Sequence, residues 1–484
     1  MLQAMNFAAI SVEIGIAVLM VLVLLLDLML KKDAPRCPVV WLTVAGLLGV
    51  LALAVGMYPP DGGAAAFYAG LYIVDGYSVF FKILFIVGIL STVIFAADYV
   101  EQTFQHKGEF YLLLLSALLG MCVLASANDL MTAFVGLELM TISFYALVAI
   151  RTDSPFSAEA GIKYLVFGSG STAVLLYGMS LVYGMTGTMV FQEIAQGLGL
   201  VFSLGLIGVV FILAGFFFKL SIIPFHLWAP DVYEGAPAPV TALLAMCSKA
   251  AGIAILLRVI FVAFPALSAY WAHLLAIFAA VSMVGGNLMA FRQTNIKRML
   301  AYSSIAQAGY MMTAMVATNA AGIKAVLFYA MVYVFANVGA FVTVSYLEMK
   351  RGGADLASVR GLAKDSLLPA GILMVALLTM AGIPPTAGFV GKIYIFSAAI
   401  DAGYLWLAGV GFVMSMMSVY YYLLVIKEMF RDVEEGEKVV EERLRLPLPA
   451  SAMGVIAVAF SLIIGVWAEP LAIFTNVAVY TFMR

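Results

Sequence analysis

The chain has little of what soluble proteins depend on. Only 11% of its 484 residues are charged, while 64% are hydrophobic; soluble domains average about 25% charged and about 45–50% apolar residues. The net charge of −2 gives no sign of nucleic-acid binding. Because the apolar excess runs along the whole length, the composition indicates an integral membrane protein without a separate soluble domain.

Cysteine and histidine are scarce, with three residues of each. Cys37, Cys122 and Cys247 have no CxxC spacing, so they cannot form a structural metal site or an iron–sulfur cluster by themselves. The chain also has no Walker A sequence, no GxGxxG after a strand, no CxxCH and no plausible pair of haem-binding histidines. We therefore expect no cofactor and no metal in this chain, and its driving energy must come from an ion gradient or a partner.

Long apolar stretches predict membrane-crossing helices, because only helices and closed barrels satisfy their backbone polar groups in lipid. The first stretch has no basic region before it and no obvious cleavage site, so we expect it to be retained. Two stretches are overlong and should break at their prolines, Pro224 and Pro384–Pro385. The sequence predicts an all-α polytopic membrane protein of about 14 transmembrane helices, at 8–30, 38–58, 77–100, 108–126, 129–151, 158–187, 203–230, 238–264, 269–291, 298–318, 322–348, 366–400, 404–430 and 450–480.

The basic residues of the loops orient this bundle, because positively charged loops stay on the cytoplasmic side. Loops after even-numbered helices hold essentially none of them. We therefore expect both termini on the outer side, and the lack of a transit peptide favours the inner (plasma) membrane of a bacterium. Loops after odd-numbered helices hold 17 of the 25 lysines and arginines: Lys31, Lys32, Arg36, Lys107, Arg151, Arg292, Lys297, Arg298, Lys350, Arg351, Arg360, Lys364, Lys427, Arg431, Lys438, Arg443 and Arg445.

The two proline-broken helices, the seventh and the twelfth, indicate an internal repeat. Each is the fourth helix of a five-helix unit, and the odd helix count inverts the second unit relative to the first. We predict two inverted five-helix repeats, at 108–264 and 265–431. The repeats would be preceded by helices 1–3, in residues 1–107. They would be followed by a cytoplasmic loop and helix 14, in residues 432–484.

Seven basic residues fall within the predicted spans, where a charge at the bilayer centre costs about 2.5–3.5 kcal/mol on insertion scales. Lys82, Arg258 and Lys324 lie near helix ends, so we expect their long side chains to reach the membrane interface. Lys163 lies one turn into its helix and fits either a structural or a functional role.

The other three, Lys219, Lys249 and Lys392, lie deeper or beside a proline break, so we predict a hydrated polar interior around them. Glu138 is the only acid deep within a predicted span, and pairing it with Lys219 is the simplest way to keep both ionised in lipid. Burial favours a neutral lysine and a nearby carboxylate favours a charged one, so such a group can load and unload a proton. His226 either feeds protons to Lys219 or caps a helix.

Three motifs resemble the antiporter-like membrane subunits of respiratory complex I, over about residues 108–430. The run Pro-Asp-Val-Tyr-Glu-Gly-Ala-Pro is typical of the subunit N branch, whereas sister subunits and Mrp cation/proton antiporters usually have Asp-Ala and a different run. The motifs are Lys219-Leu-Ser-Ile-Ile-Pro-Phe-His-Leu-Trp-Ala-Pro-Asp-Val-Tyr-Glu-Gly-Ala-Pro-Ala-Pro-Val240, Arg292-Gln-Thr-Asn-Ile-Lys-Arg-Met-Leu-Ala-Tyr-Ser-Ser304 and Ala381-Gly-Ile-Pro-Pro-Thr-Ala-Gly-Phe-Val-Gly-Lys392.

The resemblance implies a proton-translocating subunit of NADH:quinone oxidoreductase that carries out no redox chemistry itself. NADH, FMN, iron–sulfur clusters and quinone would then be bound by partner subunits, and the chain would contact other membrane subunits and lipid. Lys163 matches a sixth-helix lysine of relatives, and Gln307 departs from the histidine that some relatives have there, although glutamine can still hold a water chain. The family's proton path of one glutamate and three lysines matches Glu138, Lys219, Lys249 and Lys392.

Other functions also fit the sequence. A Na⁺/H⁺ antiporter subunit of the Mrp kind would differ in its neighbouring genes. A pump subunit of a related membrane-bound hydrogenase or coenzyme-F420 dehydrogenase would use the same machinery. A purely structural scaffold would leave pumping intact after all four buried charges are neutralised.

Overall fold

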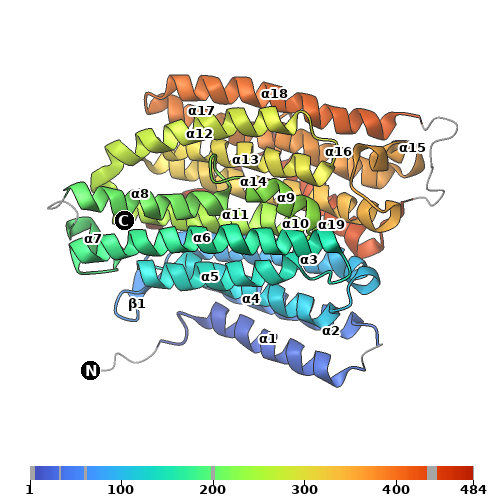
Figure 1. Ribbon diagram of the computed structural model, residues 1–484, viewed down its shortest axis with the longest axis horizontal. Helices are drawn as coiled ribbons and strands as arrows, with labels where there is room; N and C mark the ends of the chain where they lie inside the picture. Colours follow the sequence, from blue (N-terminus) through green and yellow to red (C-terminus); the bar gives the residue numbers. More distant parts are fainter. Residues whose placement is uncertain (1–5, 32–33, 59–62, 198–201, 433–443, 483–484) are drawn as a thin grey trace.

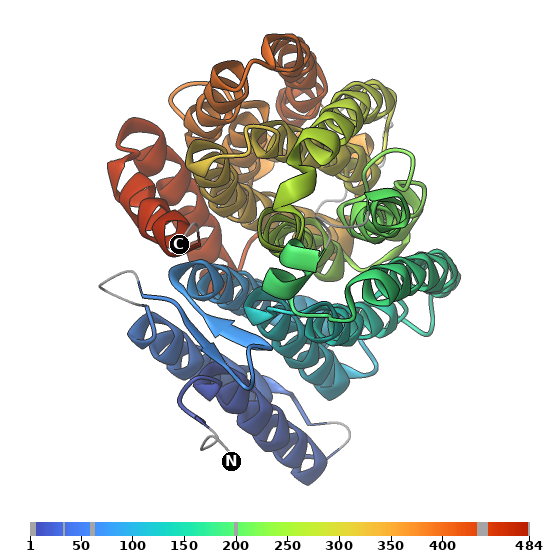
Figure 2. The ribbon, with the colours of Figure 1, turned by 90° about the vertical axis from the view of Figure 1, so that its left-hand side faces the viewer.

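Near-parallel helices make up most of the structure. The computed structural model describes residues 6–31, 34–58, 63–197, 202–432 and 444–482, and its helices lie along one common direction (Figure 1). Seen end-on, α1 and α2 lie at one edge of the bundle and α17 and α18 at the opposite edge (Figure 2).

The elements are, in chain order, α1 (Ser11–Met29), α2 (Cys37–Gly56), β1 (Ala65–Phe67), β2 (Tyr72–Val74), α3 (Gly76–Thr103), α4 (Lys107–Ser126), α5 (Leu130–Val148), α6 (Pro155–Thr186), α7 (Phe191–Gly197), α8 (Phe202–Leu220), α9 (Trp228–Gly235), α10 (Ala238–Leu243), η2 (Leu244–Ser248), α11 (Lys249–Arg258), η3 (Val259–Ala263), η4 (Pro265–Leu267), α12 (Ser268–Ala290), α13 (Ile296–Met315), α14 (Ala320–Arg351), η5 (Leu356–Val359), α15 (Leu362–Asp365), α16 (Leu367–Ala381), α17 (Ala387–Asp401), α18 (Leu405–Phe430), α19 (Leu448–Val466) and α20 (Glu469–Phe482).

Eleven helices of the described chain are long and apolar enough to cross a membrane. Two shorter apolar helices accompany them, within α8 and at α16. The predicted class, an all-helical multi-span membrane protein, is therefore confirmed.

The helices differ greatly in burial. The apolar stretch of Ala238–Ala263 is completely buried and that of α14 is 94% buried, whereas only 28% is buried in α1, α6 and α19. The first two therefore form the centre of the bundle, and the other three present apolar faces outward, as lipid or a neighbouring membrane subunit requires.

Both predicted helix breaks are present. The first separates α8 from α9 around Pro224, and the second separates α16 from α17 around Pro384–Pro385. Proline ends a helix because it has no N–H and clashes with the carbonyl four residues earlier. At the second break Gly382 adopts a left-handed conformation with φ +79°, and a Cβ there would lie 2.8 Å from the Lys392 side chain.

Several predicted boundaries were wrong. The span predicted at 450–480 is two helices, α19 and α20, because Pro470 suits the first turn of a new helix but not a helix interior. The predicted helix 238–264 contains two π-helical turns, η2 and η3. The short helix α7 and the antiparallel β1–β2 hairpin were not predicted. Of the basic residues used for orientation, Lys32, Lys438 and Arg443 lie outside the described residues.

The two ends of the bundle are built differently. One end, which we call the hairpin end, carries the β1–β2 hairpin and α7, and the opposite end carries α15 (Figure 1). The hairpin is fixed to the corner between α4 and α5, where Asn128 Nδ2 donates to Gly70 O at 2.8 Å and Tyr72 pairs with Ala127. We call the opposite end the α15 end.

Candidate functional site

The three lysines predicted to be functional are buried at or beside the helix breaks. Lys219, Lys249 and Lys392 are 2%, 1% and 4% exposed. Lys219 lies in the last turn of α8, Lys249 begins α11 directly after the π-helical turn η2, and Lys392 lies in the second turn of α17. A buried ammonium needs hydrogen-bond partners, so the identity of its partners decides its chemistry.

Lys219 is hydrogen-bonded to hydroxyl groups. Its Nζ donates to Thr141 Oγ1 at 2.9 Å and to Tyr164 OH at 3.1 Å. The Tyr164 ring is stacked on Trp228, which begins α9, with the ring centroids 4.5 Å apart. Both halves of the first broken helix therefore contribute to this site.

Glu138 acts on Lys219 by its charge, but the two are not joined by a direct ion pair in the described structure. Glu138 is half-buried and accepts a hydrogen bond from Thr172 Oγ1 at 2.8 Å. Among the described residues no ion pair within 4.0 Å joins it to Lys219, which instead bonds Thr141, three residues further along α5. The physical reason is one of register: three residues advance a helix by about 4.5 Å, so the lysine meets the next turn of α5.

Lys249 is held by backbone carbonyls. Its Nζ donates to Leu220 O at 3.0 Å and to Ser304 O at 3.2 Å. Leu220 is the last residue of α8. The final carbonyls of a helix have no intrahelical partner and carry about half a negative charge. The end of α8 therefore supplies the counter-charge that a carboxylate would otherwise provide.

Lys392 repeats this arrangement at the second break. Its Nζ donates to Met380 O at 3.0 Å and Ala381 O at 2.8 Å, the carbonyls of the last two residues of α16. Ser415 Oγ accepts a third bond at 2.8 Å, and the Tyr310 ring lies 4.9 Å from Nζ. At each break, the carbonyl end of the first half-helix, α8 or α16, thus accepts hydrogen bonds from one buried lysine.

A polar connection on α13 joins the sites of Lys249 and Lys392. Ser304, whose carbonyl binds Lys249, lies one helical turn before Gln307. Gln307 Nε2 donates at 3.0 Å to Met380 O, the same carbonyl that binds Lys392. The glutamine that departs from the family pattern therefore occupies the junction between the two lysines.

Two buried serine hydroxyls beside these lysines have no hydrogen-bond partner in the described structure. Those of Ser221 and Ser248 are buried two residues after Lys219 and one residue before Lys249, respectively. Buried polar groups are normally paired with protein or with ordered water. The row of lysines is therefore lined with groups that can hold water.

Lys163 belongs to a different environment. Its Nζ lies 2.7 Å from Asp231 Oδ2 and 2.8 Å from Glu159 Oε1, and its side chain is 37% exposed. Arg298 bonds Asp231 and Glu234, each at 2.7 Å, which completes an exposed cluster of ion pairs. No hydrogen bond between described residues connects Lys163 to the buried lysines.

His226 lies in the first break, buried, with Nδ1 3.4 Å from Pro224 O. No hydrogen bond in the described chain connects it to Lys219. Its proposed role as a proton donor stays a prediction, and the observed contact stabilises the break itself.

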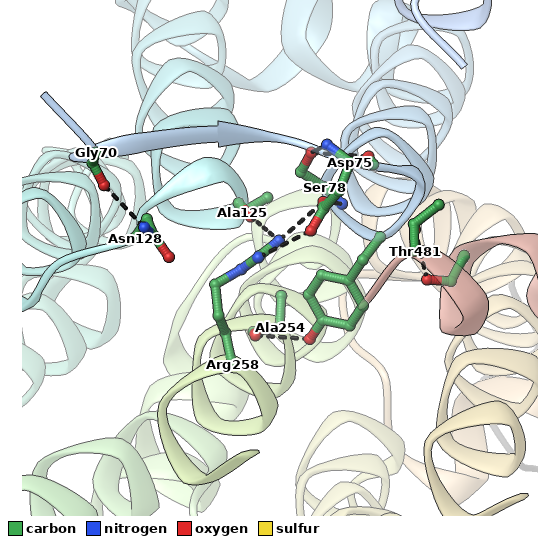
Figure 3. Close-up of polar contacts among 10 residues, drawn as sticks. Gly70, Asp75, Ser78, Ala125, Asn128, Ala254, Arg258 and Thr481 are labelled. Atoms are coloured by element: carbon green, nitrogen blue, oxygen red, sulfur yellow. Dashed lines mark hydrogen bonds and ion pairs between the residues drawn. The ribbon is translucent and has the colours of Figure 1, made fainter. Parts of the chain in front are cut away.

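Two of the three cations expected at the membrane interface are instead completely buried. Lys82 lies 2.8 Å from Glu13 Oε1 and 2.7 Å from Tyr72 OH. Arg258 makes two bonds of 3.0 Å to Asp75 (Figure 3). The interface prediction is wrong for both, because acids near the starts of α1 and α3 fold inward against them. For Lys324, half-buried with Nζ 5.7 Å from the Tyr394 ring, it stays a prediction.

A third buried ion pair was also missed. Lys297, predicted to lie in a loop, is 5% exposed in the first turn of α13, with Nζ 2.5 Å from Glu348 Oε2. It also donates to Ala236 O at 2.8 Å, directly after α9. An acidic N-cap before a predicted helix, such as Asp75, was the one available sequence signal for any of these pairs.

Comparisons with known proteins agree with this architecture. The family model for the membrane region of the NADH:quinone oxidoreductase/Mrp antiporter proteins matches residues 127–418. The chain is 46% identical to the NADH-quinone oxidoreductase subunit N of Heliobacterium modesticaldum, with 98% of this chain and 99% of that protein covered. It is 39% identical to the NAD(P)H-quinone oxidoreductase subunit 2 of Trichodesmium erythraeum, with 95% and 88% covered.

Solved structures give the same result. A chain of respiratory complex I from Thermus thermophilus is 36% identical, with a TM-score of 0.81 over 95% of this chain and 98% of that one. A chain of the Mrp complex from a Dietzia species has a TM-score of 0.88 over 99% and 98%, but at 21% identity it shows the fold alone. The protein belongs to the antiporter-like membrane subunits of NADH:quinone oxidoreductase, in the subunit N branch.

Proposed function

We propose that this chain moves protons across the membrane as a subunit of an NADH:quinone oxidoreductase. The observation that carries the proposal is the row of three buried lysines, each hydrogen-bonded to neutral oxygens and lying on a broken helix or, for Lys249, against the end of one. A lysine in such a shell is supported both as an ammonium and as an amine, because an amine still donates to a carbonyl or hydroxyl. It can therefore exchange a proton without losing its place in the fold.

The proposed topology has fourteen membrane crossings. This number counts α8 with α9, α16 with α17, and α19 with α20 as one interrupted crossing each. Two inverted repeats, 108–264 and 265–431, form the core, with 1–107 and 432–484 as flanking segments. Basic residues such as Lys107, Arg298 and Lys364 lie in or beside connections at the α15 end, so we place that end in the cytoplasm and both termini on the outer side of a bacterial inner membrane.

In the proposed mechanism, a proton enters from the cytoplasm through the first repeat and reaches Lys219. It passes to Lys249, through the water-lined polar connection at Ser304 and Gln307 to Lys392, and leaves outward through the second repeat. Glu138, one turn from the site of Lys219 on α5, adjusts the proton affinity of that lysine by its charge. Lys163 in its exposed cluster and His226 in the first break would act on the cytoplasmic side as proton-collecting groups.

The energy for this transfer comes from elsewhere. Each proton moved against 100 mV requires about 2.3 kcal/mol. Redox chemistry in partner subunits that bind NADH, FMN, iron–sulfur clusters and quinone supplies it, and adjacent membrane subunits transmit it to this chain.

The test is Lys219→Ala in the intact complex reconstituted into liposomes. We expect NADH-driven proton uptake to fall strongly, measured with a pH-sensitive dye, while the complex still assembles. Lys324→Ala is the matched control, because Lys324 is a half-buried lysine outside the row and should leave proton uptake unchanged. Normal pumping by a normally assembled Lys219→Ala complex would remove the buried lysines from the path.

A further inference from the structure

Arg258 and Asp75 form a closed ion pair at the hairpin end of the first repeat. Arg258 Nη1 and Nη2 each bond one oxygen of Asp75 at 3.0 Å, and Nη2 also donates to Ala125 O at 3.2 Å (Figure 3). The side chains of Arg258 and Asp75 are 2% and 1% exposed. Asp75 Oδ1 in addition accepts from Ser78 N at 2.7 Å, so both carboxylate oxygens are occupied.

Aromatic rings enclose the guanidinium. Its Cζ lies 4.8 Å from the centroid of Tyr77 and 5.6 Å from that of Phe482 on α20. Helix α20 approaches closely because Gly76 has no side chain; a Cβ at this position would lie 2.8 Å from Thr481 Oγ1. These rings cover the ion pair, although the buried Nε of Arg258 has no hydrogen-bond partner among the described residues. The close packing leaves little room for water at this point.

The pair lies on the same helix as a lysine of the proposed proton path. Lys249 and Arg258 are the first and last residues of α11, so they are about 14 Å apart along its axis. Tyr77 OH donates to Ala254 O at 2.7 Å, between these two positions. A proton that left Lys249 along α11 towards the hairpin end would therefore meet Arg258.

The residue types at this position are unsuited to proton transfer. A guanidinium stays protonated in proteins, whereas an ammonium can release its proton. Both oxygens of the Asp75 carboxylate are already occupied by charge-assisted hydrogen bonds from Arg258. This composition contrasts with the path itself, where every buried cation is a lysine with neutral partners.

We propose that the Arg258–Asp75 pair seals the outer end of the first repeat against protons. The inference rests on the proposed function and extends it: a subunit that loads Lys249 from the cytoplasm must stop that proton from escaping directly outward, or returning, before it reaches Lys392. Arg258 and Asp75 are positioning and sealing residues, and neither takes up the transported proton.

The proposed seal is tested by measuring the passive proton permeability of the purified complex in liposomes. A membrane potential is imposed and no NADH is added. The variant Arg258→Gln/Asp75→Asn replaces the pair with neutral amides that leave polar gaps for water, and it should raise permeability several-fold. The matched control Arg258→Met/Asp75→Leu, at the same two positions, keeps the site dry and should remain as tight as the unmodified complex.

Each other result contradicts the seal. Unchanged permeability in the amide variant would overturn it, and so would an equal increase in both variants, which would mark the pair as a purely structural tie. Adding Lys249→Ala to the amide variant should abolish the leak, and a leak that persists would run elsewhere. If the amide variant does not assemble, Arg258→Lys replaces it, because a shorter single-nitrogen cation also opens the bonded network. The readout needs no redox turnover, so it separates this inference from the pumping proposal.

Discussion

The buried lysines and arginines among the described residues fall into two groups that differ in their partners and not in their burial. All six are at most 5% exposed. In the first group a carboxylate lies within 3.0 Å, and in the second the hydrogen-bond partners are hydroxyl groups or backbone carbonyls. The paired group is Lys82, Arg258 and Lys297, and the group with neutral partners is Lys219, Lys249 and Lys392.

The difference separates structural from exchangeable charge. Removing one member of a buried ion pair costs about 3–5 kcal/mol, because the other charge is left uncompensated. A lysine among neutral oxygens leaves no stranded charge when it gives up its proton. Burial of a cation alone therefore does not mark a candidate proton-transfer group, whereas burial with neutral partners meets the requirement of the proposed role.

The largest effect on proton uptake should come from replacing a lysine that has neutral partners by arginine, whereas the same replacement in an ion pair should have little effect. Lys249→Arg keeps the charge but cannot release its proton, so NADH-driven proton uptake should fall by about a hundredfold, as general acid–base groups typically contribute 10²–10⁴-fold. Lys297→Arg, in an ion pair, should retain uptake. Equal losses in both variants, at equal assembly measured by native electrophoresis, would erase the distinction between the groups.

Next in size is the loss of an ion-pair partner. Glu13→Ala leaves Lys82 buried without its carboxylate and should destabilise the protein by about 3–5 kcal/mol, seen as a lower thermal unfolding temperature. The double variant Glu13→Leu/Lys82→Met should be close to the unmodified protein in stability. A single variant that is as stable as the double would show that the pair is not a structural tie.

A smaller effect is expected at the junction between Lys249 and Lys392. Gln307→Leu removes the bond to Met380 O and the bond that Tyr329 OH donates to Gln307 Oε1 at 2.5 Å. Proton uptake per electron should fall several-fold, and Gln307→His, which restores a polar group, should recover most of it. Full pumping by Gln307→Leu would show that the Gln307 side chain does not connect the sites of Lys249 and Lys392.

The smallest effect should be at the exposed cluster around Lys163. Because its side chain is 37% exposed, Lys163→Ala should change stability by at most about 1 kcal/mol. Its effect on proton uptake should be weaker than that of Lys219→Ala. A loss as large as that of Lys219→Ala, in the same liposome assay, would place Lys163 among the essential groups.

The sequence alone was sufficient to predict those features that one residue type dictates. The breaks at Pro224 and Pro384–Pro385 follow from the missing N–H of proline, and the deep lysines follow from their depth in apolar runs. It was insufficient where tertiary register decides. No local sequence pattern predicts the contact of Glu13 with Lys82, because it forms only when two helices from different parts of the chain pack together.

The same limit applies to the contacts of Glu138. A single helical turn separates it from Thr141, and only the packing of α5 against α8 and α6 determines which of the two meets the amino group of Lys219. The hairpin escaped prediction for a different reason: its strands have three residues each, too few for a periodic signal.

The helix ends that hold Lys249 and Lys392 have a consequence for stoichiometry. Peptide oxygens neither bind nor lose hydrogen ions near neutral pH, so their negative polarity is constant throughout a catalytic cycle. Each such site can consequently change its occupancy by only one, with no second group able to buffer or share the exchange. In the proposed relay, each of these two sites would then hold at most one transported proton at a time, a limit that the fold imposes through its helix ends.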